Sequence, residues 1–445
     1  MKKHWLLKLV AMLLAFGLVA AACGDDDDDD SSDSGSSGEE VSLDGTTVTI
    51  TGPERDDSEA GAIQAALDVF AERNGMTITY TGDADWEANI NTQVEGGNPP
   101  NISIFPQPGK LADFFRDGHL VALNDSAAAA TASNWSEAWT AFGNVDGTQV
   151  GVPVKTDLKS LVWYQPAKFE AAGYEVPETF DDFTALVGTM IADGNTPLCV
   201  GIESGQATGW TYTDWVEDMM LRLHDPDVYD DWVNHDIPFN DDRVVDAMTQ
   251  VLDLWNTEGA VFSSGGSIAA TAFQDNGGPL VDGDCMMHRQ ASFYAAFFPE
   301  GTAFADGSED AVDVFYFPSI RGDRPVLGAG TLAAGFDAEP ATHAVLEFMS
   351  TAEYAELRQE AQVELRGGGL SGFLSAANGQ DLGVYAPLEQ SFIDILATAE
   401  VVRFDASDLM PADVGAGTFW TEGTAAVNGD ISAQEAADNI EASWP

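Results

Sequence analysis

The 445-residue chain contains 18 basic and 74 acidic residues, which gives it a formal net charge of −56 at pH 7. A surface this acidic repels the phosphates of nucleic acids and anionic lipid headgroups, so we predict that the folded protein binds neither. The length and the 44% of hydrophobic residues allow either one large core or two lobes of ordinary size.

The N-terminus looks like a lipoprotein signal peptide. Lys2 and Lys3 precede an apolar run from Leu9 to Ala22, and small residues lead directly into Cys23. The run is too short to span a bilayer, so an uncleaved membrane helix is the weaker interpretation. We predict that residues 1–22 are removed and that Cys23 becomes the lipidated first residue, which would anchor an extracytoplasmic protein to the membrane.

Residues 23–45 follow as a predicted disordered tether. They contain six consecutive aspartates and then mainly Ser, Gly and acidic residues. Such a segment repels itself and has little to bury, so it serves as a solvated spacer. We expect folded structure to begin near Thr46.

Strands and helices alternate from that point. Thr47 to Thr51 alternates with period two, and a helical face follows at Ile63, Ala66, Leu67 and Phe70. This alternation predicts an α/β fold with βαβ units and mainly parallel sheets. Further expected strands are 76–80, 102–105, 150–154, 158–164, 198–202, 284–287 and 312–317; further expected helices include 166–173, 179–190, 213–223 and 244–255, and from Ala341 onward the chain is mostly helical.

The remaining cysteines, Cys199 and Cys285, form an even pair once Cys23 is lipidated. In an oxidising compartment we expect them to form a disulfide, the alternative being two separate buried thiols. Two thiols without neighbouring histidines cannot complete a tetrahedral metal shell, and the six histidines are scattered, so we predict no metal site.

No enzyme signature is visible. The chain has no HExxH, no G-x-S-x-G, no P-loop and no complete dinucleotide fingerprint. We therefore predict a protein without a cofactor that is not an enzyme. A pair of glycosidase carboxylates is not excluded, because spacing in the sequence does not reveal it.

Four segments, in order along the chain, closely resemble carbohydrate-type solute-binding proteins of ABC importers, in the subgroup labelled α-glucoside binding and distantly similar to maltose-binding protein. They are GVPVKTDLKSLVWY at 151–164, TGW with TDW at 208–215, CMMHRQ at 285–290, and DLMP to TFW at 408–420. The resemblance implies a monomeric, two-lobe clamp of type II that closes on a carbohydrate and delivers it to permease subunits. It places lobe one at 46–155 and 285–326 and lobe two at 156–284 and 327–445, with crossings near Lys155, Cys285 and Val326.

Sugar sites need aromatic platforms for the flat C–H faces of the rings. Trp210 follows a strand and precedes a helix, where the resembled family has a platform. Trp420 or Phe419 is similar to the second platform of the family. Trp215 lies in a helical apolar stripe, and we assign it to the core.

Sugar hydroxyls also need charged or amide partners. The candidates follow strand ends or crossings, and each has a structural alternative: a helix cap and a packed indole for Asp85 and Trp86, an inter-lobe ion pair for Lys155 and Asp157, and a structural carboxylate partner for Arg289. Gln107 and Asp405 complete the set of predicted contacts.

Two other functions compete with sugar binding. The strong acidity favours a cationic ligand such as a polyamine or a peptide, although aromatic platforms argue for sugar. A lipid-anchored glycoside hydrolase is the third hypothesis.

Overall fold

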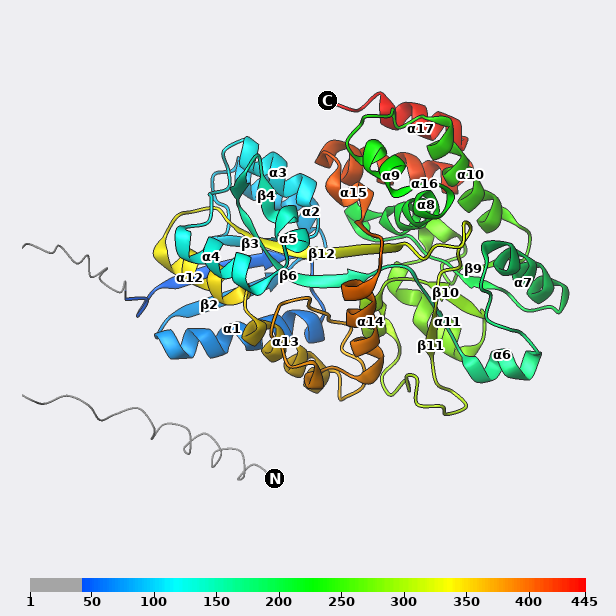
Figure 1. The fold of residues 1–445 in the computed structure, drawn as a ribbon, viewed down its shortest axis with the longest axis horizontal. Coiled ribbons are helices and arrows are strands. Elements are labelled where there is room, and N and C mark those ends of the chain that lie inside the picture. The colour runs from blue at the N-terminus through cyan, green and yellow to red at the C-terminus, as the bar shows by residue number, and fades with distance from the viewer. Residues whose placement is uncertain (1–41) are drawn as a thin grey trace, which may run out of the picture. The chain divides into compact units, whose positions relative to one another are not determined.

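The computed structural model describes residues 42–445, coloured in Figure 1. The first regular element is β1 (Thr47–Gly52), which agrees with the predicted start near Thr46. The predicted signal peptide, Cys23 and most of the tether lie outside the described residues. No helix within 42–445 is both long enough and apolar enough to cross a bilayer.

The first sheet is built around β1, which pairs in parallel with β2 and β3. Val48 and Ile50 are buried while Thr47 and Thr49 are exposed, so the predicted period-two alternation places one face on a core. Its strands are β1, β2 (Thr77–Gly82), β3 (Ile102–Phe105), β6 (Gly151–Leu158), β12 (Val326–Gly335) and β13 (Val402–Phe404), in the order β13-β12-β3-β1-β2 with β6 also on β12.

Helices of the first half pack on this sheet. They are α1 (Asp57–Asn74), α2 (Trp86–Glu95), α3 (Pro108–Arg116), α4 (Asp125–Asn134), α5 (Glu137–Thr140), α12 (Pro340–Met349) and α13 (Ala352–Leu365). Asp56 caps α1 by accepting from the amides of Ser58 and Glu59, and Gly75 ends it at φ 67°. We call the first sheet with these helices the first half.

The second sheet has the order β11-β7-β10-β8-β9. It consists of β7 (Leu161–Tyr164), β8 (Leu198–Cys199), β9 (Val261–Phe262), β10 (Met287–Arg289) and β11 (Asp313–Tyr316). Strand β8 is parallel to β9 and β10, whereas β7 is antiparallel to β10 and β11. A two-stranded hairpin, β4 (Asn144–Val145) with β5 (Thr148–Gln149), stands apart from both sheets.

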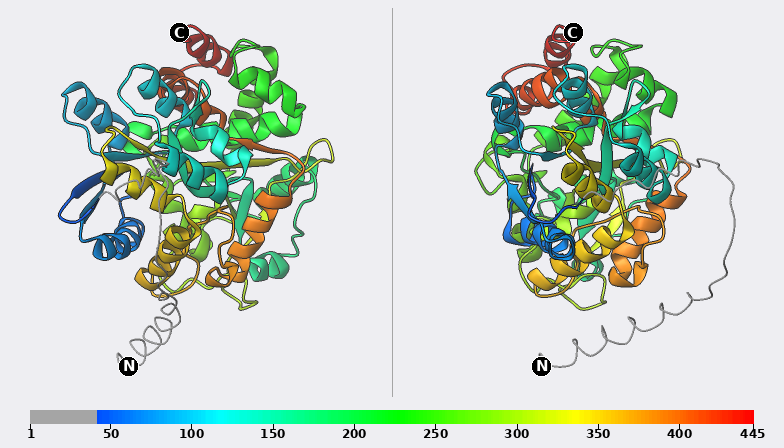
Figure 2. Two further views of the ribbon diagram at one scale, coloured as in Figure 1. Left: turned by 60° about the vertical axis from the view of Figure 1, so that its left-hand side comes forward. Right: turned by 90° about the vertical axis from the view of Figure 1, so that its left-hand side faces the viewer.

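Most remaining helices surround the second sheet, and we call this group the second half. They are α6 (Pro166–Ala172), α7 (Phe180–Ala192), α8 (Trp210–Leu223), α9 (Pro226–Val233), α10 (Asp242–Asn256), α11 (Gly277–Asp282), α15 (Ala406–Leu409), α16 (Trp420–Val427) and α17 (Ala433–Glu441). The C-terminal α16 and α17 pack against α8 and α10, as both views of Figure 2 show. Trp215 is buried in this core, which confirms its assignment.

Short single-turn segments complete the chain. The 3₁₀ turns span 141–143, 205–207, 268–270, 273–276, 292–297 and 382–384, and a π-helical turn covers Val414–Phe419. Helix α14 (Pro387–Thr398) joins a third apolar cluster with Trp163 of β7 and Ala355 of α13.

The halves are connected by an antiparallel pair of strands, β6 and β12 (Figure 1). Their register runs from Gly151 opposite Ala334 to Leu158 opposite Gly328. Only Lys159 and Ser160 separate β6 from β7, so the chain passes directly from one sheet to the other at the predicted crossing near Lys155. The second crossing is β12, which begins at Val326 and leads from the second sheet into the first, the reverse of the direction expected there.

The α/β fold with two lobes is confirmed, but the strand pairing corrects part of the predicted lobe assignment. Strands β10 and β11 lie in 285–326, which was assigned to lobe one, yet both pair with β7 in the second sheet. Strand β12 was assigned to lobe two, yet it pairs with β3 in the first. Short strands of this kind carry no sequence signal for the sheet that they join, so the expected crossing at Cys285 is wrong.

The predicted disulfide is present. Cys199 ends β8 and Cys285 lies two residues before β10, and these strands are neighbours with Leu198 opposite Met287. Their Cα atoms are 5.5 Å apart, within the usual span of a disulfide. The bond therefore braces the centre of the second sheet.

Candidate functional site

A cavity of about 240 Å³ lies beside the crossing strand β6 and is lined by residues from both halves. Its charged lining residues are Glu54, Arg55, Asp56, Glu59, Glu87, Lys155, Asp157, Lys159, Asp214, Asp405 and Asp408, and its aromatic lining residues are Trp210, Phe273, Phe293, Phe297 and Trp420. Clefts that combine aromatic walls with a few polar groups are the usual form of small-molecule sites.

Lys159 organises the wall contributed by the second half. Its ammonium donates to Asp214 of α8 at 2.8 Å and to Asp405, the residue that caps α15. The same ammonium lies 5.6 Å from the ring centroid of Trp210, a cation–π distance. A buried cation thus joins two carboxylates to an aromatic face of the cavity.

Arg289 lies behind this wall and does not line the cavity. Its guanidinium contacts Asp218 at 2.8 Å and Asp214 at 3.6 Å, and only 3% of the residue is exposed. Arg222 pairs with the other oxygen of Asp218. The predicted ligand contact at Arg289 is therefore not supported by its position, since its donors are directed to carboxylates of α8.

The wall of the first half is partnered less completely. Lys155 and Asp157, both on β6, are 3.5 Å apart, and the second oxygen of Asp157 has no hydrogen-bond partner. Glu54 follows β1, and its carboxylate accepts two long bonds, 3.3 Å from buried Arg358 and 3.5 Å from the Tyr80 hydroxyl. Gln107 is also buried at the cavity, with its amide oxygen unpartnered. Free acceptors in a cavity are available to a ligand that donates hydrogen bonds.

Burial changes the acidity of several of these carboxyl groups. It raises the pKa of Glu59 to about 8 and that of Asp157 to about 6, although nearby Lys155 opposes both shifts. Burial likewise raises the pKa of Asp214 to about 7, against the pull of Lys159. Asp408 has its pKa raised by burial and then by the charge of Asp405.

Asp405 differs from these groups. Burial alone would raise its pKa, but Lys159 and hydrogen bonds from Asp408 and Ser407 lower it below the ordinary value. Asp405 therefore carries the negative charge that holds Lys159 in place.

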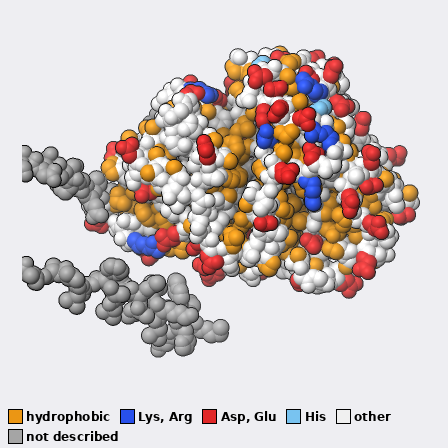
Figure 3. Space-filling view, viewed as in Figure 1, with side chains coloured by type: hydrophobic (Ala, Val, Ile, Leu, Met, Phe, Trp, Pro, Cys, Tyr) orange, Lys and Arg blue, Asp and Glu red, His pale blue; other side chains and the backbone are white. Residues whose placement is uncertain are grey.

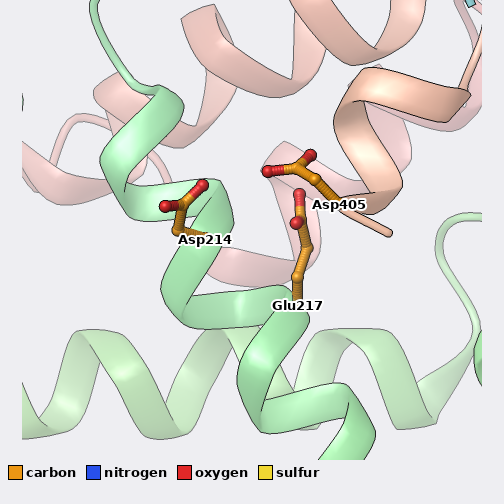
Figure 4. A group of neighbouring side chains, drawn as sticks. All are labelled: Asp214, Glu217 and Asp405. Carbon is orange, nitrogen blue, oxygen red and sulfur yellow. The ribbon is translucent and has the colours of Figure 1, made fainter. Parts of the chain in front are cut away.

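Asp214, Glu217 and Asp405 present carboxylate oxygens within 4.8 Å of one another. Figure 4 shows how the three side chains are placed. Such a cluster has the donor atoms for a hard cation. Here Lys159 already pairs with Asp214 and Asp405, and burial raises the pKa of Glu217 well above its ordinary value so that it keeps its proton. The Lys159 ammonium and the proton on Glu217 therefore offset two of the three carboxylate charges.

Aromatic residues form the remaining wall. The ring of Trp210 lies edge-on to Phe273 at 5.0 Å and 6.0 Å from Phe293. Trp420 lines the cavity as well, and its buried indole N–H has no partner. Trp210 and Trp420 thus both line the cavity, and their role as platforms for a sugar ring stays a prediction.

Three predicted residues lie elsewhere. Phe419 is buried in the second-half core against Trp232 and Phe239. Trp86 is buried against Phe105 and donates its indole N–H to Ser103, as in the packed-indole alternative. Asp85 precedes α2 but makes no side-chain capping bond; it is exposed and is not among the residues lining the cavity.

The sequence reasoning missed Lys159, Asp214 and Glu59 as lining residues. Lys159 lies within the recognised segment 151–164, and Asp214, Asp218 and Arg222 recur every four residues along α8. This spacing places Asp214 and Asp218 on one face of α8, where they pair with Lys159 and Arg289. The three lining phenylalanines carried no comparable signal.

The surface agrees with the composition. In Figure 3, acidic side chains spread over most of the face in view, and basic ones gather in a few places. Several basic residues are therefore used internally, including Lys155, Lys159 and Arg289, each less than a tenth exposed.

The chain is similar to proteins of known class. The profile of bacterial extracellular solute-binding proteins matches residues 56–356. "Osmoprotective compounds-binding protein GgtB" of Synechocystis sp. is 38% identical over 389 residues, covering 86% of this chain and 89% of that protein. "Alpha-glucosides-binding periplasmic protein AglE" of Rhizobium meliloti is 38% identical over 419 residues, covering 90% and 88%.

Solved structures share the fold. The bacterial solute receptor AcbH, whose structure is described with a preference for β-D-galactopyranose, superposes with a TM-score of 0.75 at 18% identity. That superposition covers 89% of this chain and 98% of the receptor. Maltose-bound MalE3 of T. maritima gives a TM-score of 0.67 at 15% identity, covering 89% and 98%.

Proposed function

Because this chain belongs to the bacterial extracellular solute-binding proteins, we propose that it captures an α-glucoside or a related neutral sugar and delivers it to an ABC permease. The observation that carries the proposal is the cavity, whose lining combines aromatic rings with unpartnered hydrogen-bond acceptors. The printed names of the two 38% identical relatives, for α-glucosides and osmoprotective compounds, agree with this ligand class.

The balance of free polar atoms favours a ligand with many hydroxyl groups. The unpartnered cavity oxygens belong to Gln107, Asp157, Asp214 and Thr331, and the unpartnered donor belongs to Trp420. A sugar hydroxyl donates one hydrogen bond and accepts others, so it can serve both kinds of atom. The C–H faces of the ring would lie against Trp210 and Trp420.

The built-in cations argue against a polyamine. Lys159 lies between Asp214 and Asp405 beside the Trp210 ring, the place that a ligand ammonium would take. Lys155 lies close to Asp157 in the other wall. A cationic ligand would have to compete with these two ammonium groups.

We propose that the ligand leaves unchanged. Asp214 and Asp405, the carboxylates nearest the Trp210 platform, both pair with Lys159 instead of presenting one free acid and one free base. The function is then a cycle of opening and closing about β6 and β12, in which the sugar stabilises the closed form by its higher affinity for it.

The location and the assembly belong to the same proposal. The family is extracellular, and Cys23, outside the described residues, would carry the lipid anchor. The protein would act as a monomer. Metabolic labelling with a palmitate analogue tests the anchor, since the Cys23→Ala variant should lose the label.

Calorimetric titration of the mature protein tests the ligand class. We expect binding for at least one of maltose, trehalose, sucrose or a cyclodextrin, and none for putrescine. Trp210→Ala should weaken that binding about 10- to 100-fold by removing a stacking face. Trp444→Ala, which removes a half-buried indole that is stacked on His235 and does not line the cavity, is the matched control and should bind normally.

Three results would contradict the proposal. One is binding of putrescine alone, and another is hydrolysis of an aryl glucoside that a carboxylate substitution abolishes. The third is the absence of heat and of any thermal stabilisation with every sugar, since a ligand of the native state must raise the melting temperature.

A further inference from the structure

Helix α3 of the first half contacts the turn after α15 of the second half beside the cavity. The contact is close, because a Cβ atom added to Gly109 would lie 2.0 Å from the carbonyl oxygen of Met410 and 2.9 Å from that of Leu409. Real Cβ contacts are never this short, so only glycine permits the helix and the turn to approach in this way.

Polar interactions accompany this packing. The carboxylate of Asp113, one turn along α3, accepts the amide N–H of Ala412 at 2.9 Å. The ammonium of Lys110 is almost completely buried and donates to the backbone oxygen of Glu87 at 2.7 Å. The bond from Ala412 to Asp113 crosses between the halves, whereas the bond from Lys110 to Glu87 lies within the first half and holds α3 against α2.

The position of the contact connects it to the ligand. Gly109 follows the cavity residue Gln107 by two positions, and Met410 follows the cavity residue Asp408 by two. Gln107 and Asp408 come from opposite halves. Whatever holds Gly109 against Met410 thus also sets the distance across which Gln107 and Asp408 face a ligand.

We propose that Gly109 and Asp113 of α3, with Met410 and Ala412, form a clasp between the halves that determines ligand affinity by fixing the closed form. This proposal rests on the proposed function, because it assumes that the halves separate and close on a ligand. The clasp breaks on opening, and neither Gly109 nor Asp113 has to touch the sugar. Both act as positioning residues.

Gly109→Ala is the decisive variant. Gly109 has an ordinary helical backbone inside α3, where alanine is the better helix former, so the first half should fold normally. The new methyl group conflicts only with the turn of the other half. We expect the affinity for the bound sugar to fall about 10- to 100-fold, as for an overpacked contact.

Gly188→Ala is the matched control, since that glycine lies inside α7 with no atom within 4 Å of the added carbon. Its affinity should equal that of the wild type. Small-angle scattering gives the readout that a purely structural defect would not produce: Gly109→Ala should keep its ligand-free melting temperature but lose the sugar-induced compaction.

Asp113→Ala tests the hydrogen bond without adding volume. It should lower affinity about 3- to 10-fold, because the Ala412 amide loses its acceptor only in the closed form. Asp117→Ala removes an exposed carboxylate near the end of the same helix and should leave affinity unchanged.

The outcomes separate the two proposals. The clasp would be overturned, with the proposed function left intact, if the wild type binds a sugar and Gly109→Ala binds it with the same affinity and the same compaction. A wild type that binds no sugar and shows no compaction with any sugar would overturn both proposals, because the clasp forms only in the closed form.

Discussion

The two walls of the cavity differ in how completely their buried charges are partnered. In the second half, Lys159 contacts two carboxylates, and Arg289 braces one of them from behind. In the first half, Lys155 has one carboxylate at 3.5 Å, and Arg358 gives a single bond of 3.3 Å to Glu54. The cation of the second-half wall thus has two carboxylate partners, whereas that of the first-half wall has one at a longer distance; both walls leave atoms free for a ligand, at Asp214 and Trp420 in the second half and at Gln107 and Asp157 in the first.

This difference has a physical consequence. A satisfied network of buried charges is rigid, and removing one member leaves the others unpaired in a poor dielectric. Buried polar groups that lack some of their hydrogen-bond partners lower the stability of the protein until a ligand supplies those partners. We therefore expect changes in the second-half wall to act mainly on folding, and changes in the first-half wall to act mainly on binding and pH dependence.

The largest effect should come from Lys159→Met. It leaves Asp214 and Asp405 buried without their cation, and we expect the free energy of unfolding to fall by about 3–5 kcal/mol. Denaturant titration at pH 7 measures it. Lys168→Met, which removes one bond to the Val281 carbonyl from a half-buried lysine, should cost about 1 kcal/mol at most. Equal losses in the two variants would contradict the network.

Glu59 should produce the next largest effect, as a pH dependence. Its pKa is raised by burial from 4.5 to about 8, so between these values the unfolded chain is ionised while the folded protein keeps the proton. Folding then takes up a proton, and stability falls as pH rises, by at most about 1.4 kcal/mol per pH unit. Below pH 4.5 and above pH 8, Glu59 has the same protonation in the folded and unfolded states, so its contribution to the pH dependence of stability disappears.

Glu59→Gln removes this titration. Unfolding free energies at pH 5.5 and 7.5 should therefore differ less in the variant than in the wild type. The same difference in both proteins would show that Glu59 is ionised in the folded state.

Arg358→Met should have a smaller effect than Lys159→Met, although both remove a buried cation. Arg358 makes one bond to Glu54 and lies 4.4 Å from the Phe373 ring centroid, and Glu54 borders the cavity. Methionine keeps the packing on Phe373, so we expect a loss of about 1–2 kcal/mol by denaturant titration. If Arg358→Met lowers the free energy of unfolding as much as Lys159→Met does, the two walls do not differ in how strongly their buried cations are held.

The smallest effect should be that of Asp157→Asn on binding. The substitution keeps an acceptor oxygen but removes its charge, so affinity for the bound sugar should fall about 2- to 10-fold with little change in stability. Calorimetry at pH 7 measures it, with the exposed Asp253→Asn on α10 as control. An unchanged affinity would exclude Asp157 from the ligand contacts.

Local sequence patterns predicted the helices and strands better than they predicted which strands pair with one another. The alternation at 47–51 and the stripe that contains Trp215 were sufficient for β1 and α8, because burial in each case follows the period of the element. Which sheet receives β10 or β12 depends on pairing with segments that are distant in the sequence. No local pattern records that choice, and the lobe boundaries were wrong there.

The same distinction explains the site. Phe419 and Trp420 are adjacent, and a helix turns by about 100° between neighbouring residues, so only one can face the cavity. Sequence alone left both open. Trp86 recurs with Ile90 and Val94 at spacings of four, which is the pattern of a core face, and that pattern was more informative than its place after a strand.

The crossing strand β6 carries Lys155 and Asp157 in its own sequence and leads directly into Lys159. If the halves separate as proposed, the segment that twists is the segment that supplies polar groups to the cavity. A substitution in β6 that changes the affinity for the ligand should therefore also change the rate at which the halves open and the ligand dissociates. Selection for a new nutrient and selection for faster delivery would consequently act on the same few positions.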